Sequence, residues 1–179
     1  MTALPLSLGF MAMIFNAVAA YGCKFYTFDI SGQSDSDTAS FGFWKYKGDN
    51  EVCISHRALE DDGTLVDGPI KFGRAVGIFM GLLGFPILIV LVLSTFIEIP
   101  TVAKRTTWIL MFVMLFLSIM LNVGFASETC ADVDEAFRDV DCVPDVGAIL
   151  NILAIFFWIG AAVSFMKLSP QDGLAKTAA

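Results

Sequence analysis

Charged residues are scarce in this chain. Asp, Glu, Lys and Arg make up 16% of the 179 residues, whereas a soluble domain carries about a quarter. Four stretches contain none of them: residues 3–22, 75–97, 108–126 and 146–166, which are 20, 23, 19 and 21 residues long. A helix needs roughly 20 apolar residues to cross a bilayer. Inside the bilayer there is no water, so the backbone N–H and C=O groups must form hydrogen bonds with one another, as they do in a helix. The sequence therefore predicts four membrane-spanning helices in a lipid bilayer, and no nucleic-acid partner.

Catalytic signatures are also missing. The chain has no Gly-x-Ser-x-Gly motif, phosphate-binding loop or His-Glu-x-x-His motif. Its one histidine, His56, lies outside the four stretches, which argues against bound haem or pigment and favours an ordinary surface residue over a pH sensor. We therefore expect no enzyme activity, no cofactor and no metal.

The first apolar stretch has two interpretations. Ala17-Val18-Ala19 is compatible with cleavage of a signal peptide. A signal peptide, however, has a positively charged region before its apolar run, and no Lys or Arg precedes the run here. We therefore expect a retained first helix. Four spans then place both termini on one side and the large loops, residues 23–74 and 127–145, on the other.

All four cysteines lie in these two loops: Cys23 and Cys53 in the first, Cys130 and Cys142 in the second. Disulfides persist in oxidising compartments, so we expect the loops outside, at the plasma membrane or a secretory-pathway membrane. Of three possible pairings, those within each loop close the shortest loops, and each is worth about 3 kcal/mol. A membrane thiol oxidoreductase, the alternative, usually needs a Cys-x-x-Cys pair, and none is present.

The distribution of charge supports this orientation. The two loops together carry a net charge of −9, and the inner connection and C-terminal tail carry +2. The positive-inside rule places Lys104 and Arg105, between the second and third spans, in the cytoplasm. Lys71 and Arg74, which flank the second span on its outer side, go against the rule.

The second loop is acidic. Its run lacks the spacing and the glycine of a calcium-binding EF-hand, so we expect a solvated surface that attracts cations. The residues are Asp132, Asp134, Glu135, Asp139, Asp141 and Asp145.

The first loop has the pattern of a small antiparallel sheet. Aromatic and β-favouring residues alternate with turn residues, and Gly48-Asp49-Asn50 separates two strand-like runs as in a hairpin. The expected strands are residues 24–28, 41–47 and 51–56, with 64–66 or 69–72 as a further candidate. In the second loop we expect one helical turn at residues 134–137.

Two sets of residues inside the spans point to helix packing. Gly73, Gly77 and Gly81 recur every four residues, so another helix can approach closely, either within this chain or on a partner subunit. Asn16, Asn122 and Asn151 lie at similar depths, where amides form hydrogen bonds between helices or line a pore or ligand site.

Gly42-Phe43-Trp44 followed by Cys53 resembles the Gly-Leu-Trp signature and paired cysteines of claudins and their relatives, the peripheral-myelin-protein, epithelial-membrane-protein and channel-accessory branches. The resemblance implies four helices, cytoplasmic termini and a first-loop β-sheet, with Gly42, Trp44 and Cys53 in structural roles. The sequence departs from the family in its cysteine pattern and in its C-terminal tail, which lacks the hydrophobic end that docks on scaffolds.

The sequence thus predicts an all-α transmembrane four-helix bundle with a small extracellular antiparallel β-sheet. The expected function is that of a non-enzymatic, claudin-like tetraspan, an accessory or structural subunit or an adhesion-type protein. It would present a disulfide-bonded outer domain to other membrane-protein subunits or to copies of itself. The alternative is a cation-attracting channel or a barrier-forming oligomer.

Overall fold

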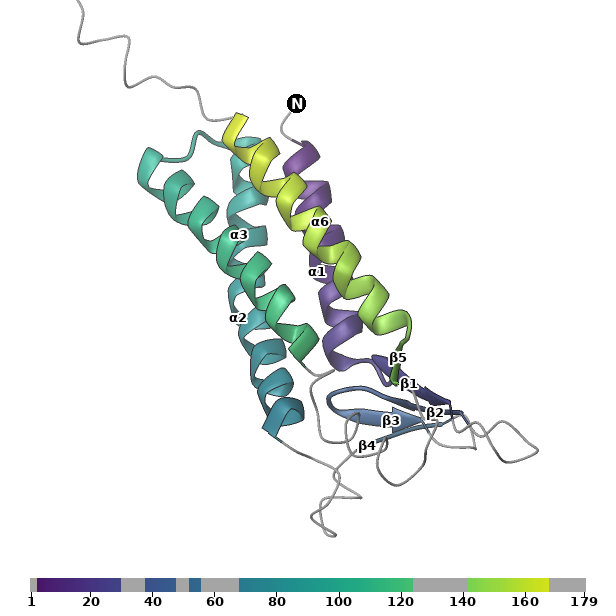
Figure 1. Ribbon diagram of the computed structural model, residues 1–179. Coiled ribbons are helices and arrows are strands. Elements are labelled where there is room, and N and C mark those ends of the chain that lie inside the picture. Colours follow the sequence, from purple (N-terminus) through teal and green to yellow (C-terminus); the bar gives the residue numbers. More distant parts are fainter. Residues whose placement is uncertain (1–2, 30–37, 48–51, 56–67, 124–141, 168–179) are drawn as a thin grey trace, which may run out of the picture.

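The computed structural model describes residues 3–29, 38–47, 52–55, 68–123 and 142–167, which form four helices and one small sheet (Figure 1). The helices are α1 (Ala3–Tyr21), α2 (Gly68–Phe96), α3 (Thr101–Leu121) and α6 (Val146–Lys167). Each is long and apolar enough to span a membrane, as predicted. Even α1, with 19 residues, is about 28 Å long at 1.5 Å per residue, close to the hydrocarbon thickness of a bilayer.

Two of the helices begin earlier than the charge-free stretches. Lys71 and Arg74 lie in the first two turns of α2, and Lys104 and Arg105 lie near the start of α3. Lys and Arg favour helical backbone, so the helix continues past the apolar segment. Residues 69–72, a candidate strand, are therefore helical.

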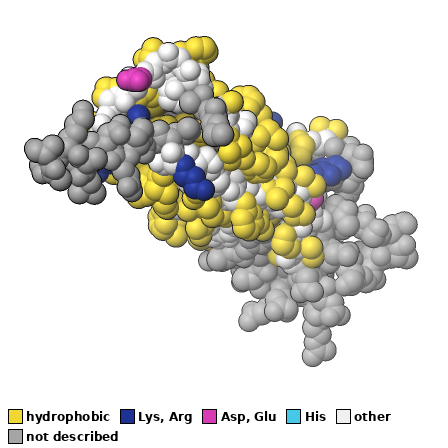
Figure 2. All heavy atoms as spheres, turned by 90° about the horizontal axis from the view of Figure 1, so that it is seen from above, with side chains coloured by type: hydrophobic (Ala, Val, Ile, Leu, Met, Phe, Trp, Pro, Cys, Tyr) yellow, Lys and Arg dark blue, Asp and Glu magenta, His cyan; other side chains and the backbone are white. Residues whose placement is uncertain are grey.

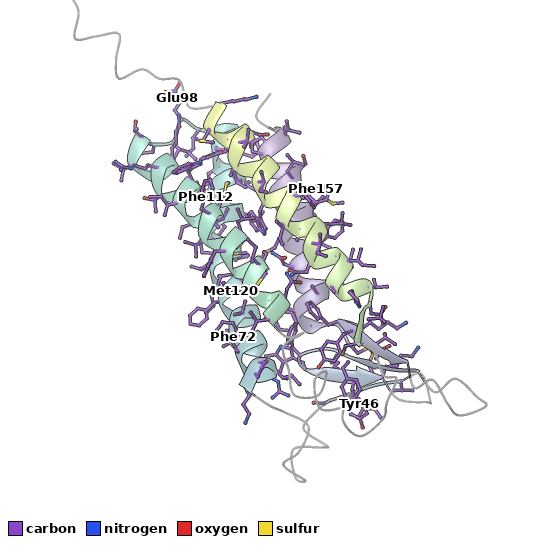
Figure 3. All side chains as sticks on the ribbon, in the orientation of Figure 1. Tyr46, Phe72, Glu98, Phe112, Met120 and Phe157 are labelled. Carbon is purple, nitrogen blue, oxygen red and sulfur yellow. A yellow bond between two sulfur atoms is a disulfide. The ribbon has the colours of Figure 1, made fainter. Side chains whose placement is uncertain are left out.

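The helices form a bundle in which α1 and α3 each pack against both α2 and α6. The sheet lies at one end of this bundle (Figure 1). The N-terminus, the α2–α3 connection and the last turn of α6 lie at the other end, where Figure 3 labels Glu98. We call these the sheet end and the opposite end.

The sheet is antiparallel and takes strands from both loops. Its order is β4-β3-β2-β1-β5, so β1 is flanked by a strand of the first loop and by one that directly precedes α6. Phe28 of β1 aligns with Cys142 of β5. The strands are β1 (Tyr26–Asp29), β2 (Thr38–Phe41), β3 (Lys45–Lys47), β4 (Cys53–Ser55) and β5 (Cys142–Pro144).

A small antiparallel sheet was predicted, but two of its details were not. The stretch 41–47 is broken at residues 42–44, so it forms the end of β2 and the whole of β3 rather than one strand. The second loop supplies a strand, β5, that the sequence pattern did not indicate. The candidate strand at 64–66 and the helical turn at 134–137 lie outside the described residues.

Small residues on α1 and α6 are buried inside the molecule, and large apolar side chains cover the outside of the bundle. The buried small residues are Gly9, Ala12, Ala19 and Ala20 of α1 and Gly147, Ala148, Ala154, Ala161 and Ala162 of α6. Figure 2 shows hydrophobic side chains over much of the outer surface, and in Figure 3 Phe72 and Phe112 point away from the bundle. Close packing of small residues with an apolar exterior suits a lipid environment.

Candidate functional site

The link between β2 and β3 is one of the places where the sheet meets the helices. The amide of Gly42 donates to Lys45 O at 2.8 Å and closes the turn. A Cβ atom at Gly42 would overlap Gly22 O and lie 3.1 Å from Cys23 Cα, just after the end of α1. Glycine is therefore required here because two backbone segments approach each other closely.

Phe43 and Trp44, which follow Gly42, attach the sheet to α1 and α2. The buried ring of Phe43 occupies the space that a side chain at Gly73 would need, and lies 4.6 Å from the ring of Phe25. Trp44 stacks on Tyr21 at a centroid distance of 6.2 Å.

Arg74 completes this contact. Its Nε donates to Phe43 O at 2.7 Å, and its guanidinium lies 5.3 Å from the centroid of the Trp44 ring. These are the geometries of a charge-assisted hydrogen bond and of a cation–π interaction. A structural role thus accounts for one of the two basic residues that go against the positive-inside rule.

Gly73, Gly77 and Gly81 of α2 face the inside of the molecule to decreasing degrees. Gly73 contacts Phe43, and a Cβ atom at Gly77 would lie 3.0 Å from Ala20 Cβ of α1. Tyr21 OH also donates to Gly77 O at 3.3 Å. At Gly81 an added Cβ would have only an ordinary contact, 3.8 Å from Tyr21 OH. The stripe therefore serves packing within this chain at its first two positions.

A disulfide joins Cys23 to Cys53, with a Cα–Cα distance of 5.9 Å. The predicted pairing within the first loop is thus confirmed. Because Cys23 directly follows α1 and Cys53 begins β4, the bond fixes the edge strand of the sheet to a helix. Cys142 is also disulfide-bonded, and its predicted partner, Cys130, lies outside the described residues.

Asp145 connects β5 to α6, and its side chain forms hydrogen bonds with two other strands of the sheet. Its Oδ2 accepts hydrogen bonds from Thr27 Oγ1 of β1 at 2.6 Å and from Ser40 Oγ of β2 at 3.2 Å. Its Oδ1 accepts from the amide of Val146, the first residue of α6, at 2.6 Å. Its own amide donates to Phe25 O at 3.1 Å.

The environment of Asp145 favours the ionised carboxyl. Partial burial raises its pKa, but the hydrogen bonds from Thr27, the Val146 amide and Ser40, with the nearby charge of Lys24, outweigh burial. The pKa of Asp145 therefore lies below its ordinary value. We grouped Asp145 with the solvated acidic surface, but its carboxylate is an internal junction between strand and helix.

A second polar group lies inside the bundle, toward the sheet end. Asn16 Nδ2 of α1 donates to Ser118 Oγ of α3 at 3.1 Å, and Asn151 Nδ2 of α6 donates to Ser118 O at 2.8 Å. All three residues are buried. The predicted layer of three asparagines is thus formed by two asparagines and a serine.

Asn122, the third predicted member, lies one turn from Ser118 toward the sheet end. Helix α3 ends at Leu121, so Asn122 is its C-cap residue and its Nδ2 donates to Ser118 O and Ile119 O, both at 3.3 Å. The prediction selected the most polar residues of the spans. Because serine is less polar than asparagine, it included Asn122 and left out Ser118.

Several predicted residues lie outside the described part of the chain. They are His56, Cys130, Asp132, Asp134, Glu135, Asp139 and Asp141. Among the residues that the structure does describe, no three His, Cys, Asp or Glu side chains are grouped in a way that holds a metal ion.

Comparison with known proteins gives no relative for this chain: no protein-family model matches it, and neither does any curated protein. The described sheet end combines a disulfide, charge-assisted hydrogen bonds and glycine contacts that all fix one sheet to the helices.

Proposed function

We propose that this chain is a non-enzymatic, claudin-like tetraspan membrane protein, an accessory or structural subunit that presents a disulfide-bonded outer domain to other membrane proteins. The observation that carries the proposal is the origin of the sheet. Strand β5, from the second loop, pairs with β1 of the first loop, so both loops contribute to one platform. A small sheet built from the first loop is also what the Gly42-Phe43-Trp44 resemblance implies.

The platform offers apolar side chains at both of its edges. Val52 is 60% exposed and Ile54 is 39% exposed at the β4 edge, and Val143 is 48% exposed on β5. Exposed apolar residues on a rigid surface are typical of sites that contact other proteins.

The orientation is part of the proposal. A disulfide at the sheet end requires an oxidising compartment, and Lys104, Arg105 and Lys167 lie toward the opposite end. The sheet end is therefore outside, with both termini in the cytoplasm.

Engineered glycosylation tests the orientation. The natural chain has no Asn-x-Ser/Thr acceptor, but Val52→Thr creates one with Asn50, and Lys104→Asn creates one with Thr106 at the opposite end. We expect a glycosidase-sensitive mass increase for Val52→Thr in a secretory-pathway membrane and none for Lys104→Asn. The reverse pattern contradicts the orientation.

Purification in mild detergent tests the accessory role. We expect a distinct membrane protein to co-purify in constant ratio, and Val52→Lys or Ile54→Lys to remove it if the β4 edge makes the contact. Val143→Lys, at the other edge of the sheet, is the matched control. A chain that purifies only as a homo-oligomer contradicts the accessory role.

A homo-oligomer would favour the alternative, a cation-attracting channel or barrier. Its test is cation conductance in reconstituted membranes after Asp139→Asn and Asp141→Asn. Asp145 is left unchanged in this test, because its carboxylate bonds to the sheet and its replacement would alter the structure.

A further inference from the structure

The buried layer of Asn16, Ser118 and Asn151 has more hydrogen-bond acceptors than donors directed at them. Asn151 is fully buried, and its Oδ1 has no hydrogen-bond partner, although Nδ2 of the same amide donates to Ser118 O. Buried polar atoms are nearly always paired because an unpaired one loses its hydration without compensation. Asn151 Oδ1 therefore marks a place where a donor belongs.

A second acceptor in the layer, Asn16 Oδ1, also lacks a good donor, because the hydroxyl of Ser118 is directed elsewhere. Its Oγ accepts from Asn16 Nδ2 and lies 2.9 Å from Met114 O and 3.4 Å from Asn16 Oδ1. A hydroxyl has one hydrogen, and the shorter contact directs it to Met114 O. Asn16 Oδ1 then also lacks a full-strength donor.

We propose that one water molecule binds in this layer and donates its two hydrogens to Asn16 Oδ1 and Asn151 Oδ1. Each amide uses only one of its two N–H groups in the bonds described above, so a remaining N–H can donate to the water oxygen. Such a water makes about three hydrogen bonds, as buried waters commonly do.

The surroundings favour water over other ligands. The three residues are at most 2% exposed, which excludes a lipid hydroxyl. The four charge-free stretches supply no counter-charge for a cation. Ala12 and Ala19 flank Asn16 along α1, and Ala148 and Ala154 flank Asn151 along α6, and all four alanines are buried.

The water completes a hydrogen-bonded group that joins three helices. Residues from α1, α3 and α6 take part, and α1 and α3 lie at opposite corners of the bundle. Helix α2 contributes none of the three residues. The water site thus fixes the register of three helices and leaves α2 to be held mainly by packing.

Nuclear magnetic resonance of the full chain in nanodiscs, with isotope-labelled asparagine, tests the proposal. We expect cross-relaxation between water and the side-chain amide protons of Asn151, with the sign that belongs to a long-lived bound water. Asn122, at the half-buried end of α3, is the control and should show only rapidly exchanging water. A folded chain in which Asn151 shows no contact with water overturns the proposal.

Two variants test whether the water bridges the two amides. Ser118→Ala keeps both acceptor oxygens, so the Asn151–water signal should persist. Asn16→Leu removes one acceptor, so the signal should be lost or become that of a short-lived water. If Asn16→Leu leaves the signal unchanged while the backbone spectrum stays native-like, the water does not join Asn16 to Asn151.

Discussion

The sheet end and the middle of the bundle are held together by different forces. At the sheet end, individual bonds fix the strands: the Cys23–Cys53 disulfide, the carboxylate of Asp145 and the Arg74 contact with Phe43. In the middle of the bundle, small residues on α1 and α6 allow close packing, and one polar layer adds hydrogen bonds. Single substitutions should therefore have large effects at the sheet end and smaller effects along the bundle.

The disulfide should give the largest effect. Replacing Cys23 and Cys53 together by Ser opens a loop with a sequence separation of 30. We expect the free energy of unfolding to fall by about 3.5 kcal/mol on the chain-entropy model. Denaturant unfolding in detergent micelles measures it, and protease cleavage near β4 should accelerate because the edge strand is released. Equal stability of the two proteins contradicts the assignment of β4 as a strand held by this bond.

Gly42→Ala should have the next largest effect. The added methyl group overlaps the carbonyl of Gly22, which belongs to the backbone and cannot rotate away. We expect a loss of about 2–3 kcal/mol, as for overpacked sites. Gly68→Ala, where an added Cβ meets nothing within 4 Å, is the control and should change stability by less than about 0.5 kcal/mol.

Asp145 should make the sheet end sensitive to acid. The pKa of Asp145 is lowered from the ordinary value of 3.8. The ionised carboxyl therefore contributes fully to the free energy of unfolding above that pH, and this contribution is lost as the pH falls through the lowered pKa. Asp145→Asn should reduce the free energy of unfolding by about 1–2 kcal/mol at neutral pH.

Denaturant unfolding of wild type and Asp145→Asn at a series of pH values tests this prediction. The difference between wild type and Asp145→Asn isolates this carboxyl from the other acidic groups. That difference should stay constant above pH 5 and shrink below about pH 4. A difference that does not change with pH means that the shape of Asp145, and not its charge, holds the junction.

Gly81→Ala should have the smallest effect, and of opposite sign. A Cβ at this position meets only Tyr21 OH at 3.8 Å, and alanine favours a helix over glycine by up to about 1 kcal/mol. We expect a gain of about 0.5 kcal/mol, whereas Gly73→Ala, against the Phe43 ring, should lose stability. If Gly81→Ala instead dissociates a co-purifying protein, the glycine stripe also contacts a partner.

The sequence predicted those parts of the fold that depend on local composition. The four helices followed from the absence of charge, and the first-loop pair Cys23–Cys53 followed from the short loop that it closes. The starts of α2 and α3 did not follow, because Lys71, Arg74, Lys104 and Arg105 are good helix formers beyond the apolar segment.

Features that depend on distant contacts were not predictable. Strand β5 has three residues, including a proline, and its partner β1 lies more than a hundred residues away. Asp145 resembles its acidic neighbours in sequence, and only the positions of Thr27 and Ser40 distinguish it. Ser118 gave a weaker polar signal than Asn122, yet it faces the interior.

The pairing of β1 with β5 also has a consequence for biosynthesis. A ribosome releases β1 to β4 long before β5, with α2 and α3 in between. Strand β1, which lies between β2 and β5, must therefore wait, paired on one side only, until two further helices have entered the membrane. During that interval its free edge can pair with the wrong strand. Completion of the sheet is thereby coupled to the arrival of the last helix.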